Sequence, residues 1–433
     1  MYEISIAAIG NVDSGKSTLA GTLTKDVLDD GRGFARNTII KYNHEKETGR
    51  TSTITKYIIE RQENKYYTLV DLAGHEKYLK TTLLGLSSML IDHCLILIGA
   101  NMGISKMTKE HLGIAVALKK PLTIILTKID IAPKSILKQT IKDLKLILKR
   151  IKHIKGYKIY GEDFKNKNYD NYNLDDINFS NDFINIICVS NVTGYNLKFL
   201  KKYVTSINSI TNWKEKVKNE SRFTISSKFN VNGVGLVLSG QITNGIISKN
   251  DKLFLGPFYG RWIRFNVKSI HNDFCEDINN IKAGEGGCLA IRCFDKKDEY
   301  FIKHRKFKKG LIVVSNKTKS YWNFKSEVLI LNSHCTTICR NYQPVINCNS
   351  IVQCAKLINI NKNEQNIENK QRLTEKELIL EKNKEDVLRG GDKSISEFKF
   401  CHRPEFIEVG DIFIFREGRT RGLGKIIEIS NEF

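Results

Sequence analysis

One short segment of the 433-residue chain constrains its fold more than any other, the glycine-rich stretch GNVDSGKS at Gly10–Ser17. An apolar run, Ile4–Ile9, precedes it and is typical of a buried strand, and a helical pattern opens at Lys16. The stretch fits GxxxxGK[ST], a spacing in which glycines let backbone N–H groups turn toward phosphate oxygens at a helix N-terminus. The segment therefore predicts a phosphate-binding loop at the carboxyl end of a strand.

Strand-like and helix-like segments alternate over the first half of the chain. Further buried apolar runs occur at Tyr66–Val70, Leu95–Gly99, Leu122–Leu126 and Ile184–Val189. Helical stretches such as Thr108–Leu118 and Ser135–Ile154 separate some of them. This alternation predicts an α/β domain with a doubly wound, mostly parallel sheet and helices on both faces.

The pattern changes after about residue 218. Short alternating runs divided by Gly and Asn follow, as in Phe223–Phe229 and Gly235–Leu238, and a second β-rich set begins near Trp322. Such runs indicate all-β barrels. We therefore expect three domains, an α/β phosphate-loop domain at 1–212 and two β-barrels at 213–318 and 319–433.

Three more polar motifs each follow a strand-like run. They are DLAGH (Asp71–His75), which fits DxxG, TKID (Thr127–Asp130), which resembles NKxD, and VSNVTG (Val189–Gly194). Ligands of doubly wound sheets bind at the carboxyl ends of the strands, so we expect all four motifs to meet there. An Asp in the third motif accepts two hydrogen bonds from the ring edge of guanine, which adenine cannot donate. The motifs therefore predict GTP and GDP as ligands.

The expected nucleotide contacts are spread over the four motifs. They are Gly10, Asn11, Val12, Asp13, Ser14, Gly15, Lys16, Ser17 and Thr18 in the first, Asp71 and Gly74 in the second, Thr127, Lys128 and Asp130 in the third, and Ser190, Asn191 and Val192 in the fourth. We expect Lys16 to reach the β- and γ-phosphates, Ser17 and Asp71 to hold Mg²⁺, and the N–H of Gly74 to sense the γ-phosphate.

The chain also carries GRGFAR (Gly31–Arg36), ETGRTST (Glu47–Thr53) and DLAGHEKYLKTT (Asp71–Thr82). With these motifs it resembles translational GTPases of the elongation factor Tu and elongation factor one-alpha type, and within them the GTP-binding protein one and two subfamily. The resemblance covers nearly the whole chain, including both barrels. It implies a P-loop GTPase domain followed by two barrels, and a GTP-hydrolysing switch that acts on the ribosome or tRNA.

The resemblance adds roles for individual residues. His75 stands where translational GTPases carry the His that positions the attacking water, so His75, Lys16 and Asp13 are the expected catalytic residues. Thr51 matches the switch residue that joins Ser17 and Asp71 around Mg²⁺ in the GTP state. Asp13 matches an Asp beside which a monovalent cation binds. Thr127 departs from the usual Asn of NKxD, and we expect its shorter side chain to bond less well to the loop beneath guanine.

The charge balance bears on partners. Lys and Arg total 69 against 47 Asp and Glu, a formal net charge of +22. A surplus of this size favours a polyanionic partner such as RNA, with a drift toward Lys-rich composition as the alternative. We expect ribosome or tRNA binding, no DNA partner and a monomer.

The same bulk features bear on location. Ten cysteines occur without a CxxC pair, which is typical of a reducing compartment. The N-terminal MYEISIAAIG lacks the layout of a signal peptide, and no apolar run reaches about 18 residues. We expect a cytoplasmic protein that does not span a membrane.

Three functional readings stay open at this point. The first is an elongation-like factor that delivers tRNA, and the second is a ribosome-rescue or mRNA-surveillance GTPase of similar shape. The third is a metabolic regulatory GTPase with the same three domains. Fold alone cannot separate them, because one architecture serves all three.

Overall fold

The chain divides into two compact units. A computed structural model describes residues 1–39, 54–75, 78, 82, 85–86, 90–151, 154–162, 172–304, 310–330, 337–361, 387–417 and 420–431. The first unit covers nearly all of the chain up to Thr211, and the second begins at Asn212.

The first unit is built on one sheet, with the strand order β2-β3-β1-β4-β5-β7-β6 in the described residues. The strands are β1 (Tyr2–Gly10), β2 (Thr55–Arg61), β3 (Lys65–Asp71), β4 (Ile91–Gly99), β5 (Leu122–Thr127), β6 (Gly156–Tyr160) and β7 (Phe183–Cys188). Strands β1, β4, β5, β7 and β6 pair in parallel, whereas β2 runs antiparallel to β3.

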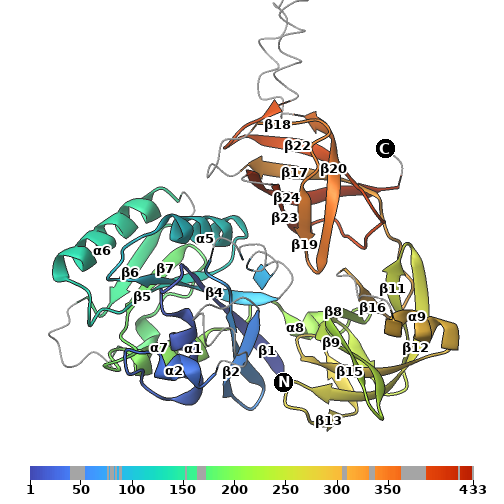
Figure 1. Ribbon diagram of the computed structural model, residues 1–433, viewed down its shortest axis with the longest axis horizontal. Coiled ribbons are helices and arrows are strands. Elements are labelled where there is room, and N and C mark those ends of the chain that lie inside the picture. The colour runs from blue at the N-terminus through green and yellow to red at the C-terminus, as the bar shows by residue number, and fades with distance from the viewer. Residues whose placement is uncertain are drawn as a thin grey trace, which may run out of the picture. The chain divides into compact units, whose positions relative to one another are not determined.

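Helices cover both faces of this sheet. They are α1 (Lys16–Lys25), α2 (Phe34–Asn37), α5 (Lys106–Ala117), α6 (Lys134–Lys149) and α7 (Leu197–Ser206), with a 3₁₀ turn, η2, at Leu174–Asp176. Figure 1 shows α5 and α6 over one face and α1 and α7 over the other. The predicted doubly wound, mostly parallel sheet is therefore confirmed. In the part of the chain that the structure describes, no helix is both long and apolar enough to cross a membrane.

The central strands explain where the motifs meet. Nearly every residue of β1, β4, β5 and β7 is buried, because helices cover both sides of the sheet. The segments after β1, β3, β5 and β7 carry the four polar motifs. The sheet thus brings segments that lie far apart in the sequence to one edge, as a doubly wound fold predicts.

Helix α6 is shorter than the expected helix at Ser135–Ile154. It ends at Lys149, and the chain then tightens into i→i+3 bonds, from Arg150 N–H to Ile147 O and from Ile151 N–H to Leu148 O, both 3.0 Å long. Such bonds close the last turn of a helix and redirect the chain, which enters β6 at Gly156.

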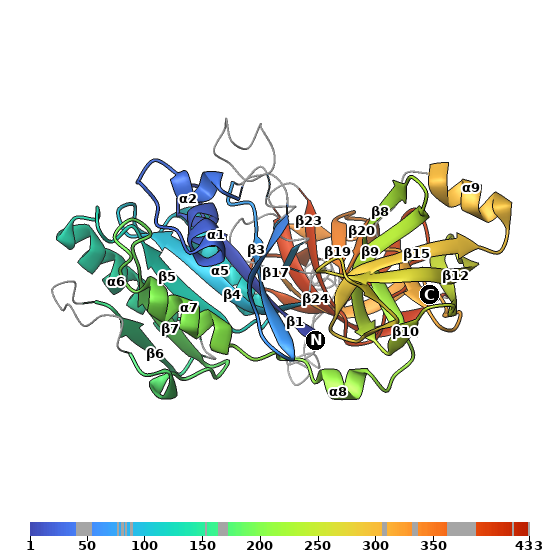
Figure 2. The same ribbon diagram turned by 90° about the horizontal axis from the view of Figure 1, so that it is seen from below.

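The second unit contains two closed antiparallel barrels, as predicted. Strands of the first barrel follow the order β11-β16-β8-β9-β15-β12, and β12 pairs back with β11. They are β8 (Arg222–Val231), β9 (Gly235–Asn244), β11 (Lys252–Phe258), β12 (Arg261–Asn272), β15 (Gly286–Cys293) and β16 (Ile312–Val314). Figure 2 shows β8, β9, β15 and β12 side by side. Smaller elements accompany them: α8 (Trp213–Lys216), β10 (Ile246–Ser248), β13 (Asp277–Ile278), β14 (Asn280–Lys282) and α9 (Lys296–His304).

The second barrel has the order β17-β22-β20-β19-β23-β24 and closes through β17 and β24. Its strands are β17 (Asn323–Ile330), β19 (Val345–Cys348), β20 (Ile351–Asn361), β22 (Lys393–Phe400), β23 (Ile412–Glu417) and β24 (Thr420–Ser430), with a separate pair β18 (Ile338–Cys339) and β21 (Val387–Leu388). Phe324, Phe398 and Phe413 pack against one another at its centre, with ring centroids 5.4–5.7 Å apart. Among the described residues, closure leaves neither barrel with a long unpaired edge.

A buried polar chain ties three elements of the first unit together. The His93 ring on β4 lies 2.8 Å from the Thr123 hydroxyl on β5, and that hydroxyl bonds to the Tyr203 hydroxyl on α7. Burial lowers the pKa of His93 from 6.5 to about 3, because water cannot solvate a charged ring there. The folded state thus holds His93 neutral.

This burial predicts a pH dependence of stability. A depressed folded-state pKa favours folding above 6.5, and that contribution is lost as pH falls from 6.5 toward 3. Between pH 6.5 and 5.5 the free energy of opening should fall by about 1 kcal/mol more in the wild type than in His93→Gln. Amide hydrogen exchange of β4, corrected for the chemical exchange rate, measures it. Parallel profiles for the two proteins would contradict the buried neutral ring.

Candidate functional site

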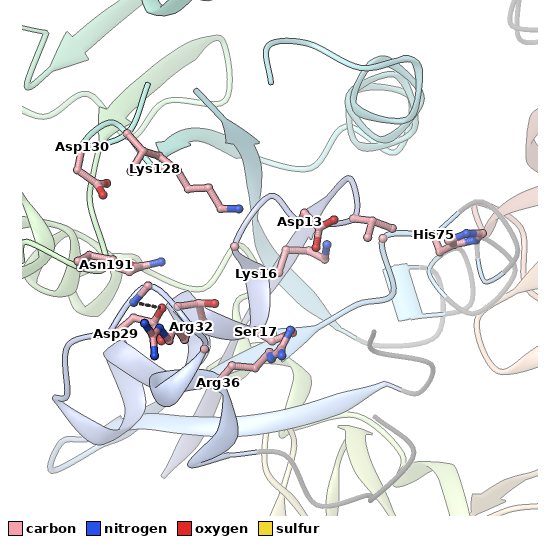
Figure 3. Close-up of a pocket in the computed structure, with 18 residues that line it drawn as sticks. Asp13, Lys16, Ser17, Asp29, Arg32, Arg36, His75, Lys128, Asp130 and Asn191 are labelled. Carbon is pink, nitrogen blue, oxygen red and sulfur yellow. Dashed lines mark hydrogen bonds between the residues drawn. The ribbon is translucent and has the colours of Figure 1, made fainter. Parts of the chain in front are cut away.

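A cavity of about 400 Å³ lies at the carboxyl edge of the sheet (Figure 3). It brings together the larger part of the predicted site: Val12, Asp13, Gly15, Lys16, Ser17, Thr18, Gly74, His75, Lys128, Asp130, Asn191 and Val192 line it. Six other predicted residues lie outside the lining: Gly10, Asn11, Ser14, Asp71, Thr127 and Ser190. A cavity of this size suits a small-molecule ligand.

The phosphate loop is formed by backbone geometry. Asp13 has a positive φ of 59°, and Gly15, the residue before α1, has φ 83°. These left-handed residues turn the chain so that α1 begins at Lys16, with the first N–H groups of the helix lacking intrahelical partners. A helix N-terminus of this kind attracts anions.

The Lys16 side chain lies under the loop. It is 7% exposed, and its Nζ donates to the carbonyl oxygens of Asn11 at 2.7 Å and Gly10 at 3.1 Å. Burial lowers the pKa of Lys16, and the charges of Asp71 and Asp13 oppose that shift. The arrangement places the Lys16 amine beside the loop, within reach of a phosphate bound there.

Ser17 and Asp71 form the predicted metal-binding pair. The Ser17 hydroxyl donates to a carboxylate oxygen of Asp71 at 2.7 Å, and Asp71 is 1% exposed. A hydroxyl and a carboxylate in contact beside a phosphate loop are the oxygen ligands that Mg²⁺ prefers, so these residues fit the ion. Thr51, the third predicted ligand, lies outside the described residues.

Gly74 approaches the phosphate loop closely. A Cβ at this position would collide with Lys16 Nζ, and it would lie 2.5 Å from the carbonyl oxygen of Gly10. The segment after β3 therefore reaches the loop only because residue 74 has no side chain. The next residue, His75, is half-buried and points away from Lys16 in Figure 3, with its ring 6.1 Å from that of Tyr78.

The TKID motif contributes both a tether and a polar wall. Thr127 is fully buried, and its hydroxyl donates to the carbonyl of Ser14 at 2.7 Å. The bond from residue 127 to the phosphate loop is thus made despite the shorter side chain. Lys128 has a positive φ of 60°, which a non-glycine residue adopts at a cost, and it lines the cavity with Asp130.

The loop after β7 closes the same side of the cavity. Ser190 Oγ accepts from the N–H groups of Thr193 at 3.1 Å and Val192 at 3.3 Å, which holds the loop in a turn. This turn presents Asn191 and Val192 to the cavity. The Asn191 side-chain oxygen accepts a 3.4 Å hydrogen bond from Thr22 on α1, so the loop is also attached to the phosphate-loop helix.

Sequence reasoning missed one wall of the cavity. Its residues are Asp29, Gly31, Arg32, Gly33 and Arg36, together with Ile131. Five of the six fall in or beside the GRGFAR segment, which the sequence marked as a family motif without a role. The segment holds two arginines, but no local pattern in the sequence assigns it to the cavity.

Comparisons with known proteins identify the family to which the chain belongs. Residues 2–210 match the family described as "Elongation factor Tu GTP binding domain". GTP-binding protein 1 of Xenopus laevis is 36% identical, over 99% of this chain and 63% of its own length. GTP-binding protein 2 of Homo sapiens is 31% identical, over 99% of this chain and 69% of its own length.

Solved structures share the fold. The translation elongation factor SelB from Methanococcus maripaludis, in complex with the GTP analogue GPPNHP, aligns with a TM-score of 0.65 at 21% identity, over 100% of this chain and 80% of that one. The S. cerevisiae Ski7 GTPase-like domain, bound to GTP, aligns with a TM-score of 0.71 at 14% identity, over 98% of this chain and 97% of that one. The chain belongs to the family of GTP-binding proteins 1 and 2, and its first domain matches the GTP-binding domain of elongation factor Tu.

The Thr127 tether yields a test of the site. Thr127→Val removes the hydroxyl that binds Ser14 O, which leaves a buried carbonyl without this donor. Loss of one such bond should speed GDP release about tenfold, since an unpaired buried group costs roughly 1–3 kcal/mol. Stopped-flow release of a fluorescent GDP measures the rate.

Thr123→Val is the matched control. Thr123 is also buried on β5, but its hydroxyl serves His93 and Tyr203 instead of the phosphate loop. This variant should lose stability and keep the wild-type rate of GDP release. Equal release rates for Thr127→Val and the wild type would contradict the tether.

Proposed function

We propose that this chain hydrolyses GTP with Mg²⁺ as cofactor and works as a translation-factor-like switch on the ribosome or tRNA. One observation carries the proposal: Lys16, the Ser17–Asp71 pair and Asp130 come from three separate strand ends and surround or underlie one cavity. Binding of a guanine nucleotide requires a cation, metal ligands and a group that recognises the base, and Lys16, the Ser17–Asp71 pair and Asp130 would supply them.

The residues of the phosphate loop would take the triphosphate. We assign the phosphates to the residues from Gly10 to Thr18, with Lys16 at the β- and γ-phosphates and Ser17 and Asp71 as metal ligands, joined by Thr51 in the GTP state. Bound Mg²⁺ supplies charge that neutralises the phosphate oxygens. We assign Asp13 to a monovalent cation beside the phosphates, and the N–H of Gly74 to the γ-phosphate.

The opposite end of the cavity would take guanine. Asp130 would accept from the ring edge of the base, and the stem of Lys128 would pack along its face. The loop of Ser190, Asn191 and Val192 would close over it, with the Asn191 backbone N–H toward the base, because the N–H groups of Ser190 and Val192 donate to Tyr195 O and Ser190 Oγ. Thr127 would hold this end of the cavity to the phosphate loop through Ser14 O.

His75 is the proposed catalytic residue that positions the attacking water. It directly follows Gly74, whose backbone lies against Lys16, so a rotation of its side chain would carry the ring toward the γ-phosphate. A bound partner that holds the ring in that position would lower the barrier, because phosphoryl transfer depends on positioning and charge more than on covalent chemistry.

The ribosome or a tRNA is the proposed partner. A net charge of +22 supports binding to a polyanion, and relatives of this architecture include a protein named as a translation elongation factor. Ribosome rescue, mRNA surveillance and metabolic regulation are the competing assignments. We expect the protein to act as a cytoplasmic monomer.

Base recognition by Asp130 predicts a change of nucleotide preference. Asp130→Asn replaces an acceptor with an amide, so GTP affinity should fall by about tenfold or more and affinity for a xanthine nucleotide should rise. Competition against fluorescent GDP measures both. If ATP displaced the label from the wild type as well as GTP does, the assignment of Asp130 to guanine recognition would be contradicted.

His75→Ala should separate hydrolysis from binding. The ring has no proposed contact with the base or the β-phosphate, so GDP and GTP affinities should stay within about threefold. Ribosome-stimulated turnover should fall by more than about tenfold, a loss of about 1.4 kcal/mol or more of transition-state stabilisation. Single-turnover hydrolysis with and without ribosomes gives the rates.

Two outcomes of this experiment are informative. Equal stimulated rates for both proteins would remove His75 from the catalytic assignment. A wild type that ribosomes leave unstimulated, but that an enzyme partner stimulates, would favour the metabolic-regulator reading.

A further inference from the structure

The segment between α1 and α2 forms a wall of the cavity that none of the four nucleotide motifs explains. Asp29, Arg32 and Arg36 line the cavity from this side. Figure 3 shows Arg36 extending from α2 toward the phosphate loop near Ser17, whereas Arg32 lies beside Asp29. The wall therefore places two further cations around the space proposed for the nucleotide.

Hydrogen bonds fix this wall to the loop after β7. The N–H of Asp29 donates to the carbonyl oxygen of Asn191 at 2.9 Å. The Asp29 carboxylate in turn accepts from the N–H groups of Ala35 at 2.9 Å and Gly31 at 3.1 Å. One acidic residue thus connects the start of α2 to the segment proposed to close over guanine.

Close packing fixes α2 to the phosphate-loop helix as well. A Cβ at Gly21 of α1 would collide with the carbonyl oxygen of Ala35, which is fully buried. The two helices therefore touch through their backbones, and a side chain between them would push them apart. Because Lys16 and Ser17 open α1, the backbone at Arg36 has a fixed position relative to both.

The two arginines differ in their surroundings. Arg36 is half-buried and Arg32 is exposed. A charge that is partly withdrawn from water interacts more strongly with a neighbouring charge than a fully solvated one does. A guanidinium also presents a planar fork of donors that matches phosphate oxygens.

We propose that Arg36 is a phosphate ligand of the bound guanine nucleotide, supplied from α2 opposite Lys16. The inference rests on the proposed guanine-nucleotide site and adds a residue to it. In this arrangement Lys16 approaches the phosphates from beneath the loop, and Arg36 approaches them from the α2 side.

Nucleotides with and without phosphates test the proposal. Arg36→Gln keeps a long polar side chain and removes the charge, and it should weaken GDP and GTP binding about tenfold while guanosine binding stays unchanged. Arg36→Lys should restore part of the loss, because it returns the charge without the fork. Competition against fluorescent GDP, with guanosine at millimolar concentration, gives the affinities.

Arg150→Gln is the matched control, since Arg150 is an exposed arginine of the same unit that does not line the cavity. It should bind all three ligands as the wild type does. Rising salt should weaken GDP binding less in Arg36→Gln than in the wild type, because one charge contact is gone. A merely structural role would not change this salt dependence.

Three results would overturn the inference. Unchanged GDP affinity in Arg36→Gln would exclude a phosphate contact, provided that a thermal unfolding curve shows the variant to be folded. An equal loss for guanosine and GDP would assign Arg36 to the structure of the wall. A wild type that binds no guanine nucleotide at all would instead overturn the proposed function, and this inference with it.

Discussion

The contact between the phosphate loop and the segment after β3 is the constraint on which the rest of the site depends. Lys16 Nζ is held by the carbonyls of Gly10 and Asn11, and Gly74 fits against it only without a side chain. Ser17 and Asp71 join the same two segments through a 2.7 Å hydrogen bond. A change in the occupant of the proposed phosphate end would therefore act directly on the segment that carries His75, which gives the proposed switch a physical basis.

The parallel sheet makes this contact possible. Its buried central strands hold their carboxyl ends in register, so segments distant in sequence meet at one edge. Hydrogen bonds then fix the loops at this edge. Thr127 donates to the Ser14 carbonyl, and Ser190 Oγ accepts from the N–H groups of Val192 and Thr193. The proposed catalytic and binding groups thus lie mostly in loops, and the strands position these loops.

The strands that sequence reasoning found are those buried on both faces, where continuous apolar runs occur. Edge strand β2 alternates exposed and covered residues, and β6 is only partly buried, so neither has such a run. The four nucleotide motifs follow fixed spacings and could be recognised. The wall from Asp29 to Arg36 could not, because its place depends on the backbone contact of Gly21 with Ala35 and on the bond from Asp29 to Asn191, neither of which is a local pattern.

Amide hydrogen exchange of the wild type with and without GDP and Mg²⁺ tests the central claim most directly, since it locates the ligand on the chain. GDP should protect amides in residues 10–18, 127–130 and 190–194, which lie at the carboxyl ends of β1, β5 and β7. ADP at the same concentration should leave them unprotected. Protection that lies elsewhere, or that ADP produces equally, would contradict a guanine-nucleotide site at this edge of the sheet.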